Sequence, residues 1–92
     1  MASKGPGMLD QYREIKKEYP DTVLFFRMGD FYEMFYEDAI LGSEVLGITL
    51  TSRDKNAEDP VPMAGIPWHS VEDYLRKMVQ SGHKVTVCEQ AS

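Results

Sequence analysis

The fold is decided by residues 25–38, which read FFRMGDFYEMFYED and place a Gly-Asp pair between two runs rich in aromatic and β-branched residues. Gly-Asp is a favoured two-residue connection in type II′ hairpins. We therefore expect a β-hairpin at residues 22–36 that turns at Gly29 and Asp30. The alternative is a helix that starts at Asp30, with Asp30 as N-cap and Glu33 as the third residue of a capping box.

The two alternatives give Phe31 different roles. On a strand, side chains alternate between the faces of the sheet, so Phe31, Glu33 and Phe35 would share one face and Phe31 and Glu33 could contact one ligand together. In a helix, Phe31 and Glu33 would point in different directions, and Phe31 would be an ordinary core residue on an apolar arc.

The other elements follow from periodicity and from Pro and Gly signals. Met8, Tyr12, Ile15 and Tyr19 recur at helical spacing until Pro20. The pattern then predicts a helix at 39–46 that Gly47 closes, a half-buried strand at 48–53 and a polar loop at 54–60. A strand follows at 61–66, and Pro62 confines it to an edge or makes it irregular. The last elements are a helix at 71–79, which a Ser70–Asp73 capping box opens and Gly82 closes, and an interior strand at 84–89.

These elements predict an α/β fold with one mixed β-sheet, a β-hairpin and flanking helices, in the order α-β-β-α-β-β-α-β. The strand, helix and strand at 61–89 are typical of a βαβ crossover, so we expect one parallel pair in the sheet. Residues 1–7, MASKGPG, are expected to be a flexible lead or a cloning remnant, and residues 8–92 a single domain that is cut before its end.

Composition limits the classes of function. The 92 residues are 42% hydrophobic and 27% charged, as in ordinary globular domains, and no apolar run approaches the roughly 20 residues of a membrane helix. The net charge of −5 argues against a domain that grips phosphates broadly. The single cysteine, Cys88, cannot form an internal disulfide, which favours an intracellular protein and a buried thiol.

Catalytic and metal chemistry find little support. His69, His83 and Cys88 lie too far apart in the sequence for a zinc motif. A two-metal nuclease would have carboxylates to use, but the lysine expected two residues after Glu89 is replaced by Ala91. No phosphate-binding loop or paired nucleophile and base is present. We therefore expect a non-enzymatic segment without a cofactor.

Four strings in order resemble the N-terminal mismatch-recognition domain of the MutS family of DNA mismatch-repair proteins: FRMGDFYEMFYEDA, ITLTSR, PMAGIPWHSVEDYL and VCEQ. The resemblance covers about Met8 to Gln90, and the family domain continues past this point. It implies mismatched double-stranded DNA as the partner and a cytoplasmic protein. It also implies a dimeric full-length parent that works with repair partners and binds ATP and Mg²⁺ in other domains.

The resemblance also implies roles for individual residues. The family's Phe-x-Glu motif falls on residues 31–33, so Phe31 would be a wedge that enters the minor groove of kinked DNA and stacks on a mispaired or unpaired base. Glu33 would hydrogen-bond the displaced base. Met28 and Met63 would line the groove and Arg53 would reach a phosphate; alternatively, the methionines fill the core and Arg53 is a solvated loop residue.

Two other functions remain open at this stage. An acidic α/β module with an exposed Phe31 also suits a protein-interaction or regulatory domain, in which the phenylalanine is the anchor. A degenerate nuclease-like enzyme is the weaker of the two.

Overall fold

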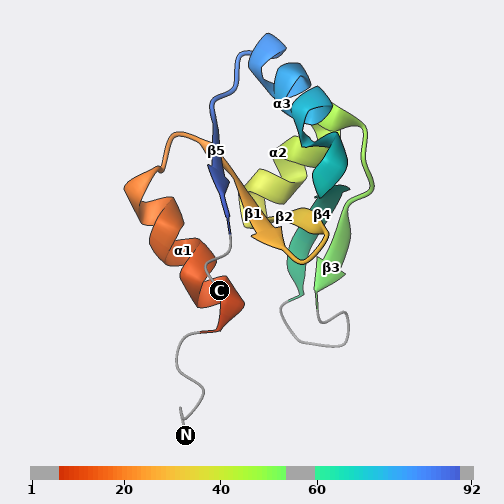
Figure 1. Cartoon of the computed structure of the whole chain (residues 1–92). Coiled ribbons are helices and arrows are strands. Elements are labelled where there is room, and N and C mark those ends of the chain that lie inside the picture. The colour runs from red at the N-terminus through yellow and green to blue at the C-terminus, as the bar shows by residue number, and fades with distance from the viewer. Residues whose placement is uncertain (1–6, 54–59, 90–92) are drawn as a thin grey trace, which may run out of the picture.

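The computed structural model describes residues 7–53 and 60–89, which form one sheet flanked by helices (Figure 1). In chain order the elements are α1 (Met8–Glu18), β1 (Val23–Met28), β2 (Phe31–Phe35), α2 (Tyr36–Leu46), β3 (Thr51–Arg53), β4 (Val61–Pro67), the 3-10 helix η2 (Trp68–Ser70), α3 (Val71–Gln80) and β5 (Val85–Cys88). This order confirms the predicted α/β pattern. Apart from Gly7 and Pro60, the predicted lead and polar loop lie outside the described residues.

The hairpin forms where residues 25–38 predicted it. β1 and β2 are antiparallel and Met28 lies opposite Phe31, which leaves Gly29 and Asp30 as the two-residue turn. Gly29 has φ 60°, and the positive φ at the first turn residue is what a type II′ turn requires. The helical alternative from Asp30 is therefore wrong. The second strand ends one residue early, because Tyr36 takes φ 58° and begins α2.

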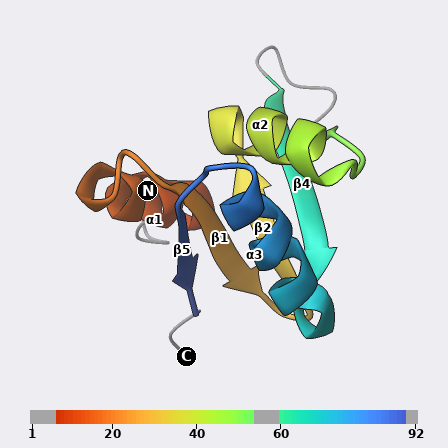
Figure 2. The same ribbon diagram turned by 90° about the horizontal axis from the view of Figure 1, so that it is seen from above.

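The sheet has five strands in the order β3-β4-β2-β1-β5. β5 pairs with β1 in parallel, and the remaining neighbours are antiparallel. The sheet thus contains a parallel pair, as predicted, but the pair is not formed by the two strands that flank α3. The connection through α3 carries the chain past β2 and β1 and places β5 on the outer side of β1. Figure 2 shows α1 on one side of the sheet and α2 with α3 on the other.

Each face of the sheet has its own core. Under α2 and α3 the largest buried side chains are Phe25, Tyr32, Met34, Ile66 and Met78. Under α1, Tyr12 packs edge-on against Phe26 and Phe35 with ring centroids 6.2 and 5.1 Å apart, and Leu24 completes the cluster. Because α1 is only 11 residues long, it covers only part of its face.

Two strand predictions need correction at the edges of the sheet. β4 was expected to lie at an edge or to be irregular, but it is a seven-residue strand between β3 and β2. Its prolines are tolerated because Pro62 and Pro67 are near the strand ends, paired with Ser52 and Phe31, and the middle of the strand keeps its ladder to β2. β5 was expected in the interior, but it is an outer strand of the described sheet, and Val87 is partly exposed there.

Two local predictions also need correction: the length of the strand at 48–53 and the capping hydrogen bond of Ser70. The strand predicted at 48–53 is reduced to Thr51–Arg53, since Ile48 packs against the core while Leu50 is exposed and the alternation has no partner strand to follow. Ser70 does precede α3, but its side chain makes no capping hydrogen bond because the η2 turn feeds directly into the helix. Gly47 ends α2 in the left-handed conformation, as predicted.

Candidate functional site

The candidate residues lie together on the α1 face of the sheet. We call this part of the face, formed by Met28, Phe31, Glu33, Arg53 and Met63, the open area. Phe31, Glu33 and Phe35 alternate along β2 and share this face, as predicted. Phe35 lies under α1 and is fully buried, whereas Phe31 is 45% exposed at the start of the strand. One strand therefore carries a phenylalanine that is buried in the core and another that is exposed at the surface.

Glu33 lies between Phe26 of β1 and Gly65 of β4 in the register of the sheet. Its Oε1 is buried and is the one such side-chain N or O atom without a hydrogen-bond partner in the described part of the chain. Burial raises the pKa of the Glu33 carboxyl, and Arg53 opposes this with a smaller lowering effect. Burial therefore makes the neutral form of Glu33 easier to reach than that of an exposed glutamate, and the neutral form can donate a hydrogen bond as well as accept one.

The other predicted site residues flank this pair on the same face. Met28 is the cross-strand partner of Phe31, and Met63 is the partner of Phe35. Both methionines are partly buried and pack against the α1 core, so they serve as core residues at the border of the open area. Arg53 is exposed on β3, within electrostatic reach of Glu33.

The turn before Phe31 is held from two sides. Arg27 Nε donates to the carbonyl oxygen of Gly29 at 2.6 Å, and the Trp68 backbone N–H donates to the carbonyl oxygen of Asp30 at 2.9 Å. The Arg27 guanidinium also lies 5.0 Å from the Trp68 ring centroid and 5.5 Å from that of Tyr32. These contacts attach the turn to η2 and fix the direction in which Phe31 leaves it.

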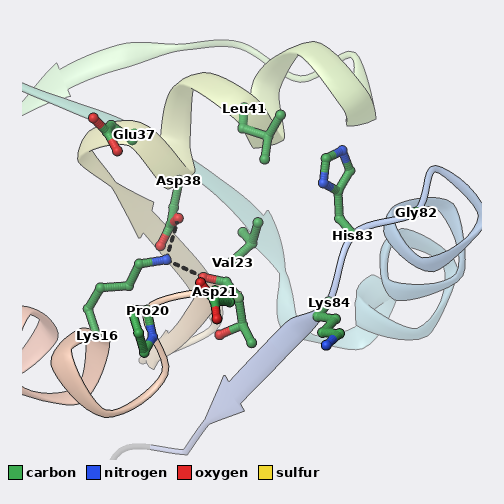
Figure 3. Close-up of a pocket in the computed structure, with 11 residues that line it drawn as sticks. Lys16, Pro20, Asp21, Val23, Glu37, Asp38, Leu41, Gly82, His83 and Lys84 are labelled. Atoms are coloured by element: carbon green, nitrogen blue, oxygen red, sulfur yellow. Dashed lines mark hydrogen bonds and ion pairs between the residues drawn. The ribbon is translucent and has the colours of Figure 1, made fainter.

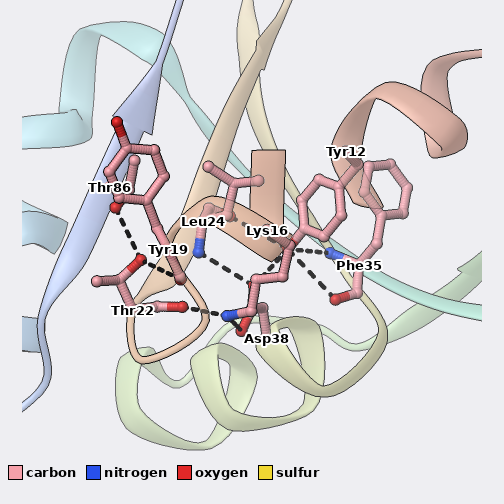
Figure 4. A network of polar contacts seen from close by, with 8 residues as sticks. All are labelled: Tyr12, Lys16, Tyr19, Thr22, Leu24, Phe35, Asp38 and Thr86. Atoms are coloured by element: carbon pink, nitrogen blue, oxygen red, sulfur yellow. Dashed lines mark hydrogen bonds and ion pairs between the residues drawn. The ribbon is translucent and has the colours of Figure 1, made fainter. Parts of the chain in front are cut away.

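A pocket of about 390 Å³ lies elsewhere, between α1, α2 and the segment that leads into β5 (Figure 3). Lys16 Nζ lies 2.8 Å from Asp38 Oδ1 and also donates to the Thr22 carbonyl oxygen. Asp38 Oδ2 accepts from Tyr12 Oη at 2.6 Å and from the Leu24 N–H at 3.1 Å (Figure 4). Because these polar groups bind one another, we assign the network to stability.

The described residues do not suggest metal chemistry. No group of three or more His, Cys, Asp or Glu side chains converges there in a way that would hold an ion. The helices in the same ranges are also too short or too polar to cross a bilayer. What the open area offers is an aromatic face for stacking and a carboxyl group beside it for hydrogen bonding.

The sequence did not single out Gly65 or Arg27 for this site. Gly65 falls inside the strand predicted at 61–66, and it belongs to β4 in the structure. A glycine inside a strand often marks the close approach of another group, and this signal could have identified Gly65. Arg27 carries no such signal, because its contacts to Trp68 and Gly29 exist only in the folded hairpin.

Comparison with known proteins gives consistent matches. The family model described as MutS domain I matches residues 6–92. The chain is 57% identical over 89 residues to the DNA mismatch repair protein MutS of Streptococcus equi subsp. equi. The aligned region covers 97% of this chain and 10% of that protein. The MutS of Streptococcus sanguinis is 59% identical over 85 residues, with 92% and 10% covered. A Streptococcus pneumoniae protein named DNA mismatch repair protein HexA is 56% identical over 85 residues, with the same coverage.

The chain spans about a tenth of the length of these curated relatives. The match extends over nearly the whole chain, and it includes the hairpin and the open area of the sheet. The α/β architecture with its mixed five-stranded sheet agrees with what the resemblance implied. The chain belongs to the MutS domain I family.

Proposed function

We propose that this chain recognises mismatched double-stranded DNA as the recognition domain of a longer mismatch-repair protein. The observation that carries the proposal is the half-exposed Phe31 beside the partly buried Glu33, on a sheet face that α1 leaves open. The names of the relatives, all DNA mismatch repair proteins, support the same function.

In this proposal Phe31 is a wedge. An apolar side chain inserted between base steps from the minor groove kinks the duplex, and unstacking costs a few kcal/mol per step. A mispaired or unpaired base is already poorly stacked, so the wedge enters such a site at lower cost than it enters a matched duplex. Phe31 suits this role because Arg27 and Trp68 hydrogen-bond the backbone of the Gly29–Asp30 turn that immediately precedes it.

Glu33 would hydrogen-bond the base that Phe31 displaces. Glu33 is only partly buried and shares the face of β2 with Phe31, so its carboxyl group can accept a hydrogen bond from a base and, when protonated, can donate one. A carboxyl group also helps to reject matched DNA, because it faces a polyanion and finds no displaced base to bind. Met28 and Met63 would border the groove, and Arg53 would approach a phosphate.

The acidic charge of −5 fits a division of labour. Phosphate contacts supply most of the non-specific affinity for DNA, and these would come from other parts of the longer protein. ATP and Mg²⁺ binding, dimerisation and contacts with repair partners would also belong to those parts, and the chain itself would act by recognition without catalysis. A cytoplasmic, DNA-associated location accompanies this proposal.

Replacement of Phe31 tests the proposal. In a full-length protein that carries this domain, Phe31→Ala should reduce the preference for a mismatched over a matched duplex by about 5- to 150-fold, because base stacking on an aromatic ring is worth about 1 to 3 kcal/mol. The matched control is Tyr19→Ala, an aromatic of similar exposure, 47% against 45%, at the opposite end of β1. Equilibrium titrations of both duplexes at one salt concentration measure the preference.

A thermal melt of the 92-residue variant accompanies the titrations. If Phe31 were a core residue, its truncation would cost about 3 to 5 kcal/mol. We expect a much smaller loss. If Phe31→Ala keeps the preference for mismatched DNA, the wedge role is refuted. If the variant instead loses binding to a protein partner and still discriminates between the duplexes, the result supports a protein-interaction domain anchored by Phe31.

A further inference from the structure

Gly65 occupies a place where a glycine is not needed by the backbone. It lies inside β4 between the buried residues Ala64 and Ile66, and Gly29, Gly47 and Gly82 are the described glycines with positive φ, not Gly65. A glycine within a strand is unfavourable, because it loses more backbone entropy on folding and packs no side chain. Its presence therefore calls for a reason in the space around it.

That space is filled by Glu33. Gly65 is the cross-strand partner of Glu33, and a Cβ placed on Gly65 would lie 3.1 Å from Glu33 Oε1 and 3.4 Å from its carboxyl carbon. The third nearest atom, the Tyr32 carbonyl oxygen, would be at an ordinary contact distance of 3.5 Å. The carboxyl group of Glu33 thus rests against the bare backbone of β4, and this close approach explains why Oε1 is buried.

We propose that Gly65 is a positioning residue for DNA recognition: its lack of a side chain lets the Glu33 carboxyl group lie against the backbone of β4, where it can hydrogen-bond to the edge of a base that stacks on Phe31. This inference rests on the proposed function. A methyl group at position 65 would lift the carboxyl group by a few tenths of an ångström toward the space reserved for the base, while the strand itself would be undisturbed.

The experiment is a double-mutant cycle between positions 65 and 33 in a full-length protein that carries this domain. Gly65→Ala should narrow the ratio of mismatched to matched affinity by about threefold to tenfold, the scale of one weakened hydrogen bond. In a Glu33→Ala background the same change should leave the ratio untouched, because the contact has been removed. A structural role for Gly65 alone would not produce this dependence on Glu33.

Gly42→Ala is the matched control. A Cβ at Gly42 would lie 2.5 Å from Met34 Sδ, on the face of the sheet that α2 covers. This variant should lower thermal stability through overpacking and leave the affinity ratio unchanged. It separates a loss of stability from a loss of discrimination.

Thermal melts of the 92-residue chain keep the inference testable if Gly65→Ala folds poorly. Any loss of stability in Gly65→Ala should disappear in the Glu33→Ala background, since the two tight contacts are both to the Glu33 carboxyl group. A loss that persists there would overturn the inference. Gly65→Ala should also shift the Glu33 pKa back toward its ordinary value, because the displaced carboxyl group is better hydrated. An NMR titration of the Glu33 carboxyl group measures this shift.

The binding outcomes separate the two proposals. If Glu33→Ala narrows the ratio and Gly65→Ala does not, the role of Gly65 is overturned and the proposed function stands. If Gly65→Ala narrows the ratio equally in both backgrounds, Gly65 does not act through Glu33, and the inference is again wrong. If Glu33→Ala leaves the ratio unchanged, the base contact proposed for Glu33 fails, and the role of Gly65 fails with it.

Discussion

Phe31 and Phe35 show how much position decides at the scale of the residue. The two phenylalanines share one strand and one face, yet Phe35 is fully buried while Phe31 is 45% exposed. The difference arises because Tyr12 of α1 packs over Phe35, whereas Phe31 lies outside the core cluster under α1. An identical side chain therefore stabilises the core at one position and remains free for a partner at the other.

Glu33 makes a prediction about pH at the same scale. Burial raises its pKa above the ordinary value of 4.5, so the folded chain holds the proton more tightly than the unfolded chain does. The protonated group therefore contributes stability that is fully present below about pH 4.5 and is lost as the pH rises through the higher pKa of the folded state. Glu33→Gln removes this titration, so the variant should gain stability relative to the parent as the pH rises.

Thermal melts of the 92-residue chain between about pH 4 and pH 8 measure this difference. Glu44→Gln, at an exposed position on α2, is the control for the loss of one carboxyl group elsewhere in the chain. A difference between Glu33→Gln and the parent that stays constant over the whole range would contradict the assignment of burial as the cause.

The junction of α1, α2 and β1 is organised by one side chain at the scale of the element. Asp38 on α2 accepts hydrogen bonds from Tyr12 and Lys16 of α1 and from the backbone of Leu24 in β1. Burial and the bond to Asp38 raise the pKa of Tyr12, which keeps its hydroxyl group in the donating form. Helices on opposite faces of the sheet are thus joined past the end of β2.

Removal of Asp38 should be costly. Asp38→Ala leaves Lys16 and Tyr12 without their acceptor, and loss of one partner from a buried ion pair costs about 3 to 5 kcal/mol. The lower end is expected here because the Lys16 side chain is 29% exposed. Denaturant unfolding of the 92-residue chain measures the loss, with the adjacent and exposed Glu37→Ala as control, which should change stability by about 0.5 kcal/mol or less. Equal effects of the two substitutions would show that the network does not hold α1 in place.

At the scale of the whole molecule, net charge determines how strongly the 92-residue chain can bind DNA by itself. Fifteen acidic residues outnumber ten basic ones, and the described ion pairs use four of the cations: Lys16, Lys17, Arg27 and Arg76. The acidic excess disfavours phosphate contacts, since each of these contacts needs a cation. In the proposed function, the fold would read the shape of a distorted base pair, and other parts of the longer protein would supply the charge that holds the duplex.

The 92-residue chain should therefore bind matched DNA weakly. Non-specific binders typically have dissociation constants of roughly 10⁻⁴ to 10⁻⁶ M at physiological salt, and this acidic chain should lie at or beyond the weak end of that range. Fluorescence anisotropy with a short matched duplex measures it, and repetition at several salt concentrations gives the number of phosphate contacts. Sub-micromolar affinity at physiological salt would contradict the prediction.

The sequence alone determined the hairpin, the order of the elements and the shared face of Phe31 and Glu33, because turn chemistry and side-chain alternation are local properties of the chain. Tertiary structure decided the order of the strands, since β5 reaches β1 only after α3 crosses the sheet. It also decided that Gly65 faces Glu33 and that Arg27 holds the turn, because these contacts join segments that are distant in sequence. Local pattern therefore placed the two contact residues on one strand face, while only the packed sheet could show what supports them.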